Sequence, residues 1–226
     1  MSWIDEKADF TFDQLIGSVL ELGRRSYAHC TLAFSLLASI GTVGDLLFPS
    51  TTSHTMVRAV LQLLVCFWLA RELAHQSGVA GQQGAKSVFG AYFVASLLIG
   101  VGLSIGYLLL VVPGILLTVR WLVAIPLVFA ARANGEVRGP LSRSWDMTGR
   151  HFWKLLAAFG IAIVLMGLAI AARSYPDVLA DNQTRIASFA IANAAAALAT
   201  IFEIVLGFAA FALMQDDKDD LARIFS

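Results

Sequence analysis

Charged residues are scarce in this sequence of 226 residues: they make up 14% of the chain, whereas a soluble domain carries about 25%. Hydrophobic residues make up 58%, so water alone cannot solvate the surface and lipid must cover much of it. Acidic and basic residues number 16 each, which excludes the strong basic field of a nucleic-acid-binding protein. We therefore expect an integral membrane protein that has no nucleic-acid partner.

Residues that carry catalysis or hold metals are few and scattered. The four histidines lie on different predicted elements and on both sides of the membrane, without the spacing of a metal site. Cys30 and Cys66 fall in apolar segments, where a free thiol packs as a small hydrophobe. We find no catalytic constellation, so we expect a non-enzymatic protein without a cofactor or metal.

The first apolar-periodic stretch predicts an amphipathic helix rather than a membrane crossing. Thr11 and Gln14 have the spacing of a capping box, in which each side chain pairs with the other residue's backbone amide. On a helical wheel the apolar arc holds Phe12, Leu15, Ile16, Val19, Leu20, Leu22 and Tyr27, and the polar arc holds Asp13, Gln14, Glu21, Arg24 and Arg25. Such a helix suits the membrane interface, and a soluble helix packed on the other helices is the alternative.

Six apolar segments follow, and a helix that crosses the hydrocarbon core needs roughly 20 apolar residues. The expected segments are residues 28–48, 55–74, 88–112, 114–133, 152–172 and 186–213. The predicted fold class is therefore all-α: a polytopic membrane bundle of six transmembrane helices with an N-terminal amphipathic interfacial helix. We predict a single membrane domain over residues 1–226, with the amphipathic helix in 1–27, the membrane helices in 28–213 and a tail in 214–226. The acidic run of the tail, residues 216–220, predicts the end of the last helix.

The third and fourth segments meet at Val112-Pro113-Gly114. Proline lacks an amide hydrogen and glycine tolerates positive φ, so we expect a tight hairpin turn at this dipeptide. A single segment of about 45 residues would be twice as long as a bilayer span. Within the fourth segment, Pro126 removes one backbone hydrogen bond and should kink the helix.

The distribution of Lys and Arg predicts the orientation, because cytoplasmic loops carry an excess of both. With the N-terminus in the cytoplasm, twelve basic residues lie inside and three lie outside, and the reverse topology would translocate most of this charge. The inner residues are Lys7, Arg24, Arg25, Arg71, Lys86, Arg132, Arg138, Arg143, Arg150, Lys154, Lys218 and Arg223, and the outer ones are Arg58, Arg173 and Arg185. Both termini are therefore predicted to be cytoplasmic.

Three charged residues fall inside membrane segments, where each requires a partner or a pathway: Asp45, Arg120 and Glu203. Asp45 and Arg120 have similar predicted depths, so we expect them to pair. Glu203 lies toward the cytoplasmic leaflet, where Arg71, Lys86 and Arg132 are its candidate partners. These charges are either interhelical contacts or the polar site of a substrate or proton path.

A second amphipathic stretch precedes the fifth segment. Its expected common face holds Leu141, Ser144, Trp145, Thr148 and Phe152, while Arg143, Asp146 and Arg150 lie away from that face. A basic stretch next to the membrane attracts anionic head groups, at about 1 kcal/mol per basic residue. We expect Arg132, Arg138, Arg143 and Arg150 to make these contacts.

The chain resembles one group of bacterial membrane proteins, most clearly from about residue 108 to residue 155. The residues that carry the resemblance are Pro113-Gly114-Ile115, Arg120-Trp121, Pro126, Arg143-Ser144-Trp145, Gly149-Arg150 and Phe152-Trp153. The group includes the membrane domain of some glycerophosphodiester phosphodiesterases and the YciC-type inner-membrane proteins. Such proteins often carry an acidic residue after the second proline, where this chain has Phe129-Ala130-Ala131-Arg132. The soluble phosphodiesterase barrel is also absent, so the resemblance implies a membrane module without the hydrolase activity.

Two functions remain open at this point. The first is a non-enzymatic protein of the bacterial inner membrane that acts on lipid organisation or serves as the partner subunit of another membrane protein. The alternative is a small transporter or permease in which Arg120, Asp45 and Glu203 form an intramembrane polar site.

Overall fold

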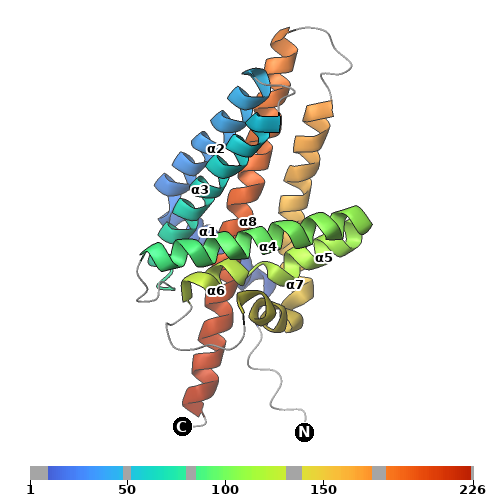
Figure 1. Cartoon of the computed structure of the whole chain (residues 1–226). Coiled ribbons are helices and arrows are strands. Elements are labelled where there is room, and N and C mark those ends of the chain that lie inside the picture. Colours follow the sequence, from blue (N-terminus) through green and yellow to red (C-terminus); the bar gives the residue numbers. More distant parts are fainter. Residues whose placement is uncertain (1–9, 48–51, 80–84, 131–138, 175–181, 225–226) are drawn as a thin grey trace. The chain divides into compact units, whose positions relative to one another are not determined.

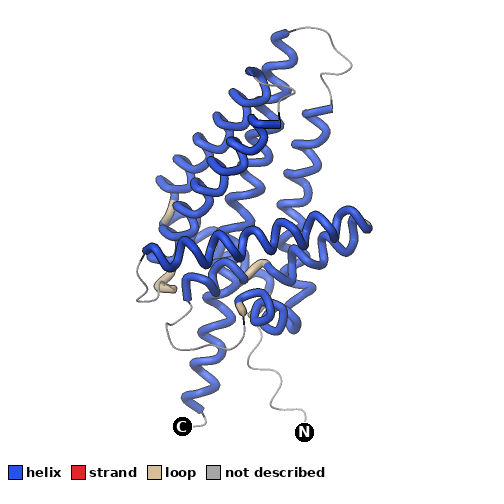
Figure 2. The backbone as a smooth tube through the Cα atoms, viewed as in Figure 1, coloured by secondary structure: helices blue, strands red, loops and turns tan. Residues whose placement is uncertain are grey.

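The computed structural model describes residues 10–47, 52–79, 85–130, 139–174 and 182–224, and in this part of the chain every regular element is a helix (Figures 1 and 2). The helices are α1 (Phe12–Arg25), α2 (Tyr27–Leu47), α3 (Thr52–Gln76), α4 (Ala85–Leu109), α5 (Val111–Trp121), α6 (Ala124–Ala130), α7 (Pro140–Ser174) and α8 (Asn182–Ile224). The predicted all-α class is confirmed.

Five stretches of the described chain are long and apolar enough to cross a membrane. They are Tyr27–Leu47, Val88–Leu109, Val111–Ala130, Pro140–Ser174 and Gln183–Gln215. The remaining expected segment, residues 55–74, is helical within α3 but is less apolar than these five. The molecule therefore has the helix lengths and hydropathy of a polytopic membrane protein.

The chain divides into two compact units, and each unit combines distant parts of the sequence. The first unit consists of Met1–Arg25, Leu73–Phe159 and Ile204–Ser226, and the second of Ser26–Glu72 and Gly160–Glu203. Both α7 and α8 thus contribute one half to each unit. The prediction of a single membrane domain stays a prediction.

In the second unit, α2 and α3 form an antiparallel hairpin. Asp45, near the end of α2, pairs with Arg58, near the start of α3, at 2.8 Å between Oδ1 and Nη1. At the other end of the hairpin, His29 Nε2 lies 3.7 Å from Glu72 Oε1. Polar contacts therefore hold both ends of the two helices in register.

In the first unit, α4 and α5 form the expected hairpin, but the turn lies earlier than predicted. The turn residue is Leu110, in extended conformation (φ −170°, ψ 151°). Pro113 lies in the first turn of α5, where backbone amides have no acceptor within the helix, so the missing amide hydrogen of proline costs no hydrogen bond. Gly114 is helical, and a Cβ on it would lie 2.4 Å from the Tyr107 ring. The glycine thus permits close helix packing, and the prediction that it shapes the turn is wrong.

The start of α1 confirms the capping box. The Thr11 amide donates to Gln14 Oε1 at 2.7 Å, and the Gln14 amide donates to Thr11 Oγ1 at 3.3 Å. Of the expected apolar arc, Leu15, Val19 and Leu22 are buried. Other members, Phe12, Leu20 and Tyr27, are exposed in the protein alone.

At the other end of the chain, α8 continues through the acidic run to Ile224, so the prediction that this run ends the helix is wrong. The run contains neither glycine nor proline, the two residues that most disfavour a helix. Aspartate and lysine are compatible with a helix. The end of the apolar stretch and the end of the helix therefore fall at different residues.

Candidate functional site

Several residues that carry the resemblance meet at the interruption between α5 and α6. Helix α5 ends at Trp121, two turn residues follow, and α6 begins at Ala124. Pro126 has no amide hydrogen to donate to the Leu122 carbonyl, and where a kink was predicted the helix is interrupted at residues 122–123. A broken helix in an apolar environment leaves carbonyl groups that need other donors.

Two buried hydroxyls from α7 supply such donors to the main-chain carbonyl of Arg120. Ser144 Oγ donates to this oxygen at 2.7 Å, and Thr148 Oγ1 lies 3.1 Å from it. Both side chains are fully buried. Because an unpaired carbonyl in a dry interior is costly, these contacts stabilise the break and attach it to α7.

The guanidinium of Arg120 lies on the same face of α7. Its carbon is 5.1 Å from the ring centroid of Trp145 and 5.3 Å from that of Phe152, and Nη1 donates to the Trp145 carbonyl at 3.3 Å. Gly149 makes room, since a Cβ there would lie 2.9 Å from Nη1. The expected common face of α7 is therefore confirmed for Ser144, Trp145, Thr148 and Phe152, and Arg120 is its partner.

The surface around this cluster combines basic and aromatic side chains. Trp145 is 44% exposed and Trp153 is 77% exposed, which marks large aromatic surface that the protein itself does not cover. Arg143 is half-buried and Arg150 is exposed, while the other two expected lipid contacts, Arg132 and Arg138, lie outside the described residues. Tryptophan and arginine together are typical of the membrane interface.

Helix α7 also fixes the start of the described chain. Lys154 Nζ donates to the Phe10 carbonyl at 2.8 Å and lies 5.7 Å from the centroid of the Phe10 ring. The same ring stacks on His151 with 4.4 Å between centroids. Phe10, which precedes α1, is thereby held against α7.

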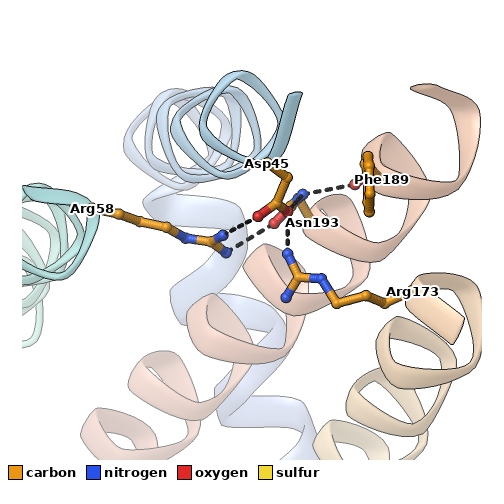
Figure 3. A network of polar contacts seen from close by, with 5 residues as sticks. All are labelled: Asp45, Arg58, Arg173, Phe189 and Asn193. Atoms are coloured by element: carbon orange, nitrogen blue, oxygen red, sulfur yellow. Dashed lines mark hydrogen bonds and ion pairs between the residues drawn. The ribbon is translucent and has the colours of Figure 1, made fainter. Parts of the chain in front are cut away.

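A second polar cluster, in the other unit, surrounds Asp45 (Figure 3). Its Oδ1 accepts from Arg58 at 2.8 Å, and its Oδ2 accepts from the Asn193 amide at 2.8 Å and from Arg173. Arg58 also donates to Asn193 Oδ1 at 2.9 Å. Asp45 thus has two arginine partners, and the prediction that it pairs with Arg120 is wrong.

This Asp45 cluster joins four helices of the second unit, since its side chains come from α2, α3, α7 and α8. Gly41, one turn before Asp45, lets α8 approach: a Cβ on it would lie 2.3 Å from Asn193 Oδ1. Asp45 and Arg58 are 16% and 19% exposed, whereas Arg173 is 48% exposed. The inner pair therefore bears most of the desolvation, and Arg173 closes the cluster at its surface.

Sequence reasoning missed Arg58, Arg173 and Asn193 as members of a site. The available signal was the orientation itself, because Arg58 and Arg173 are two of only three basic residues assigned to the outer side, where Asp45 also lies. Asn193 interrupts an alanine-rich apolar run, and a lone amide in such a run requires a partner.

Glu203, the third expected intramembrane charge, lies half-buried in α8. Of its expected partners, Lys86 and Arg132 have side chains outside the described part, and no ion pair between Glu203 and Arg71 is present among the described residues. The three charges of the transporter hypothesis therefore have separate surroundings: Asp45 in its arginine cluster, Arg120 on α7 and Glu203 in α8.

The sequence Gly102-Leu103-Ser104-Ile105-Gly106 has the spacing of a hydrolase nucleophile elbow, but its surroundings differ. That elbow needs a sharp turn between a strand and a helix, whereas these residues lie inside α4. The Ser104 hydroxyl donates to the Gly100 carbonyl at 2.8 Å within the same helix. Gly102 and Gly106 serve packing, since Cβ atoms there would lie 2.5 Å from the Trp121 ring and 3.1 Å from Gly114 Cα.

The fold and these two clusters define the class of the molecule as an all-helical membrane protein. No family model matches the chain, and no curated protein or solved structure matches it.

Proposed function

We propose that this chain is a non-enzymatic, multi-pass protein of a bacterial cytoplasmic membrane that binds anionic lipid head groups through the first turns of α7. One observation supports this most directly: the stack of Arg120 on Trp145 and Phe152 lies beside further basic residues of α7. Arg120, Arg143, Arg150 and Lys154 carry four positive charges in this region against the single negative charge of Asp146. Anionic lipid is the ligand that such a basic, tryptophan-bearing surface favours.

The proposal includes an orientation in which both termini face the cytoplasm. Twelve of the sixteen basic residues then lie on the inner side, and Asp45 neutralises part of the charge of two of the three outer arginines. We count α3 among the six membrane segments. Its Arg58 pairs with Asp45, and this pairing reduces the free-energy penalty for placing the arginine near the membrane. Helix α1, with Leu15, Val19 and Leu22 inward, then lies at the cytoplasmic interface.

We also propose kinship with the membrane module of the glycerophosphodiester phosphodiesterases and the YciC-type proteins. The support is that Arg120, Ser144, Trp145, Gly149 and Phe152, which carry much of the resemblance, lie in one cluster. A module of this kind acts on lipid itself or as the subunit of a partner protein. The basic surface of α7 favours lipid as the first ligand.

Lipid dependence of stability tests the proposal. The purified protein in a mild uncharged detergent is mixed with phosphatidylglycerol or with phosphatidylcholine, and its melting temperature is measured. We expect the anionic lipid to raise the melting temperature more, because a ligand that binds only the folded state stabilises it. The double variant R143Q/R150Q should lose much of this difference, at about 1 kcal/mol per removed charge.

Arg185→Gln is the matched control, since Arg185 is exposed on α8 and belongs to the other unit. It removes one positive charge by the same Arg-to-Gln change and should leave the lipid-dependent difference unchanged. Equal melting temperatures with both lipids would overturn the lipid proposal. A stoichiometric protein that co-purifies in native lipid particles, together with such equality, would make the chain a partner subunit instead.

A further inference from the structure

The start of α7 fixes the membrane level of the Arg120 cluster. The charge-free part of α7 comprises residues 155–172, which is 18 residues or about 27 Å and matches a hydrocarbon core of about 30 Å. All the charged residues of α7 except Arg173 precede this stretch: Arg143, Asp146, Arg150 and Lys154. Residues 144–152 therefore lie at the head-group level, and Arg120, which contacts them, lies there too.

Arg120 is also close to the middle of the α4–α5 hairpin. Gly106 lies opposite Gly114, so six residues further along each antiparallel helix Gly100 lies opposite Arg120. From this level the turn at Leu110 is about 15 Å away along α5, and the apolar part of α4 extends about 18 Å in the other direction, to Val88. The middle of the hairpin therefore lies at the depth of the lipid head groups.

A hairpin that crossed the bilayer at this level would carry half of α4 out into water. That half exposes Phe93, Val94, Leu97 and Leu98, each 46–55% accessible in the protein, and the other half continues the same stripe with Val101, Ile105 and Leu108. Two hydroxyls of the hairpin are paired within it: Ser104 donates to the Gly100 carbonyl and Thr118 to the Gly114 carbonyl. Hydrocarbon is the environment that fits the whole length of such a stripe.

We propose that the α4–α5 hairpin lies along the membrane plane, inside one leaflet, with this apolar stripe against lipid acyl chains, and that it does not cross the bilayer. Two of the six membrane segments are then in-plane elements, and four helices cross. Because a hairpin that crosses twice and one that does not cross both return the chain to the same side, the orientation of the termini is unaffected. The inference requires membrane insertion but not binding of anionic lipid.

The depth of spin labels along α4 tests this inference. In a background with Cys30→Ala and Cys66→Ala, a nitroxide is attached to V94C, V101C or L108C, at exposed positions of the stripe. The protein is placed in vesicles, and each depth is measured by power saturation with oxygen and a water-soluble nickel complex. Val94 and Leu108 are 14 residues apart, so a crossing helix separates them by about 21 Å in depth. An in-plane helix keeps all three labels within about a quarter of that distance.

Helix α2 provides the matched control. Leu32 and Leu46 are also 14 residues apart and are 50% and 39% exposed, and L32C and L46C should lie near opposite interfaces. A large depth change along both helices would overturn the in-plane hairpin while leaving the membrane protein intact. A flat profile along both would instead overturn the proposed crossing of α2. Labelling of L108C in intact cells by a membrane-impermeant maleimide would contradict the in-plane hairpin independently of spin-label mobility.

Discussion

The Ser144 hydroxyl donates a hydrogen bond to the main-chain carbonyl of Arg120, 2.7 Å away and 24 residues earlier in the chain. This contact exists because α5 breaks before Pro126, and the break leaves carbonyls that the helix no longer pairs. The side chain of the same arginine then stacks on Trp145 and Phe152. Backbone and side chain of Arg120 thus both attach the broken helix to the start of α7.

Removing the hydroxyl donors should destabilise the protein. Ser144→Ala leaves the buried Arg120 carbonyl dependent on Thr148, and we expect a loss of about 1–3 kcal/mol in the free energy of unfolding. Thr148→Val should be milder, because its hydroxyl also donates to the Ser144 carbonyl at 2.8 Å and is shared between acceptors. Unfolding by sodium dodecyl sulfate, added to protein in dodecyl maltoside, measures these changes.

Ser104→Ala is the control for this pair. Its hydroxyl caps a carbonyl of its own intact helix and lies on an exposed face, so the substitution should change stability by less than about 0.5 kcal/mol. If S144A and S104A unfolded at the same detergent fraction, the carbonyl of Arg120 would not need the α7 hydroxyls. The double variant S144A/T148V should lose more than the two single losses together, because each hydroxyl substitutes in part for the other.

Asp45→Asn should disrupt the second cluster. It removes the negative charge that Arg58 and Arg173 share, and we expect destabilisation of roughly 2–4 kcal/mol, since Asp45 is only 16% exposed. Arg58→Gln should approach this effect, whereas Arg173→Gln should stay within about 1 kcal/mol because Arg173 is half-exposed. Thermal unfolding of the three variants in the same detergent tests the order, and an Arg173 effect equal to that of Arg58 would contradict it.

Gly207→Ala should be strongly unfavourable for a reason visible only in three dimensions. A Cβ on Gly207 would lie 2.6 Å from the Leu122 carbonyl oxygen, in the interruption between α5 and α6. Backbone atoms cannot rotate away as a side chain does, so the helices must separate, at a cost of about 1–3 kcal/mol. Gly167→Ala meets no atom within 4 Å and should be neutral or slightly stabilising, since alanine favours helix. Equal melting temperatures of the two variants would contradict this packing.

The charge pair at the end of α1 predicts a pH effect. A hydrogen bond from Arg25, together with its charge, lowers the pKa of the exposed Glu21 below its ordinary value. A lowered pKa means that the pair stabilises α1 at neutral pH and that this contribution disappears as the pH falls through the lowered pKa. Carboxyl NMR of Glu21 measures the titration. Arg25→Gln should return the pKa of Glu21 toward its ordinary value. Arg24→Gln should change this pKa less, because the charge of Arg24 lowers it more weakly.

Local patterns predicted several parts of the structure from the sequence. Thr11 and Gln14 cap α1 because the two partners are only three residues apart. Pro126 disrupts its helix because its ring removes the amide hydrogen, which is a property of the residue itself. The common face of Ser144, Trp145, Thr148 and Phe152 follows from helical spacing. What failed was the pairing across helices: depth alone assigned Arg120 to Asp45, although depth says nothing about which helix faces which.

The sequence by itself determined that this is an all-helical protein with stretches apolar enough for a membrane, because composition and hydropathy depend on no contact between distant residues. The tertiary structure decided the contacts of each charge: Arg58 and Arg173 surround Asp45, and Arg120 lies on α7. It also decided the role of the glycines at 41, 114 and 207, where another segment of the chain occupies the place of a side chain. Such contacts join residues up to 148 positions apart, and periodicity within one helix carries no information about them.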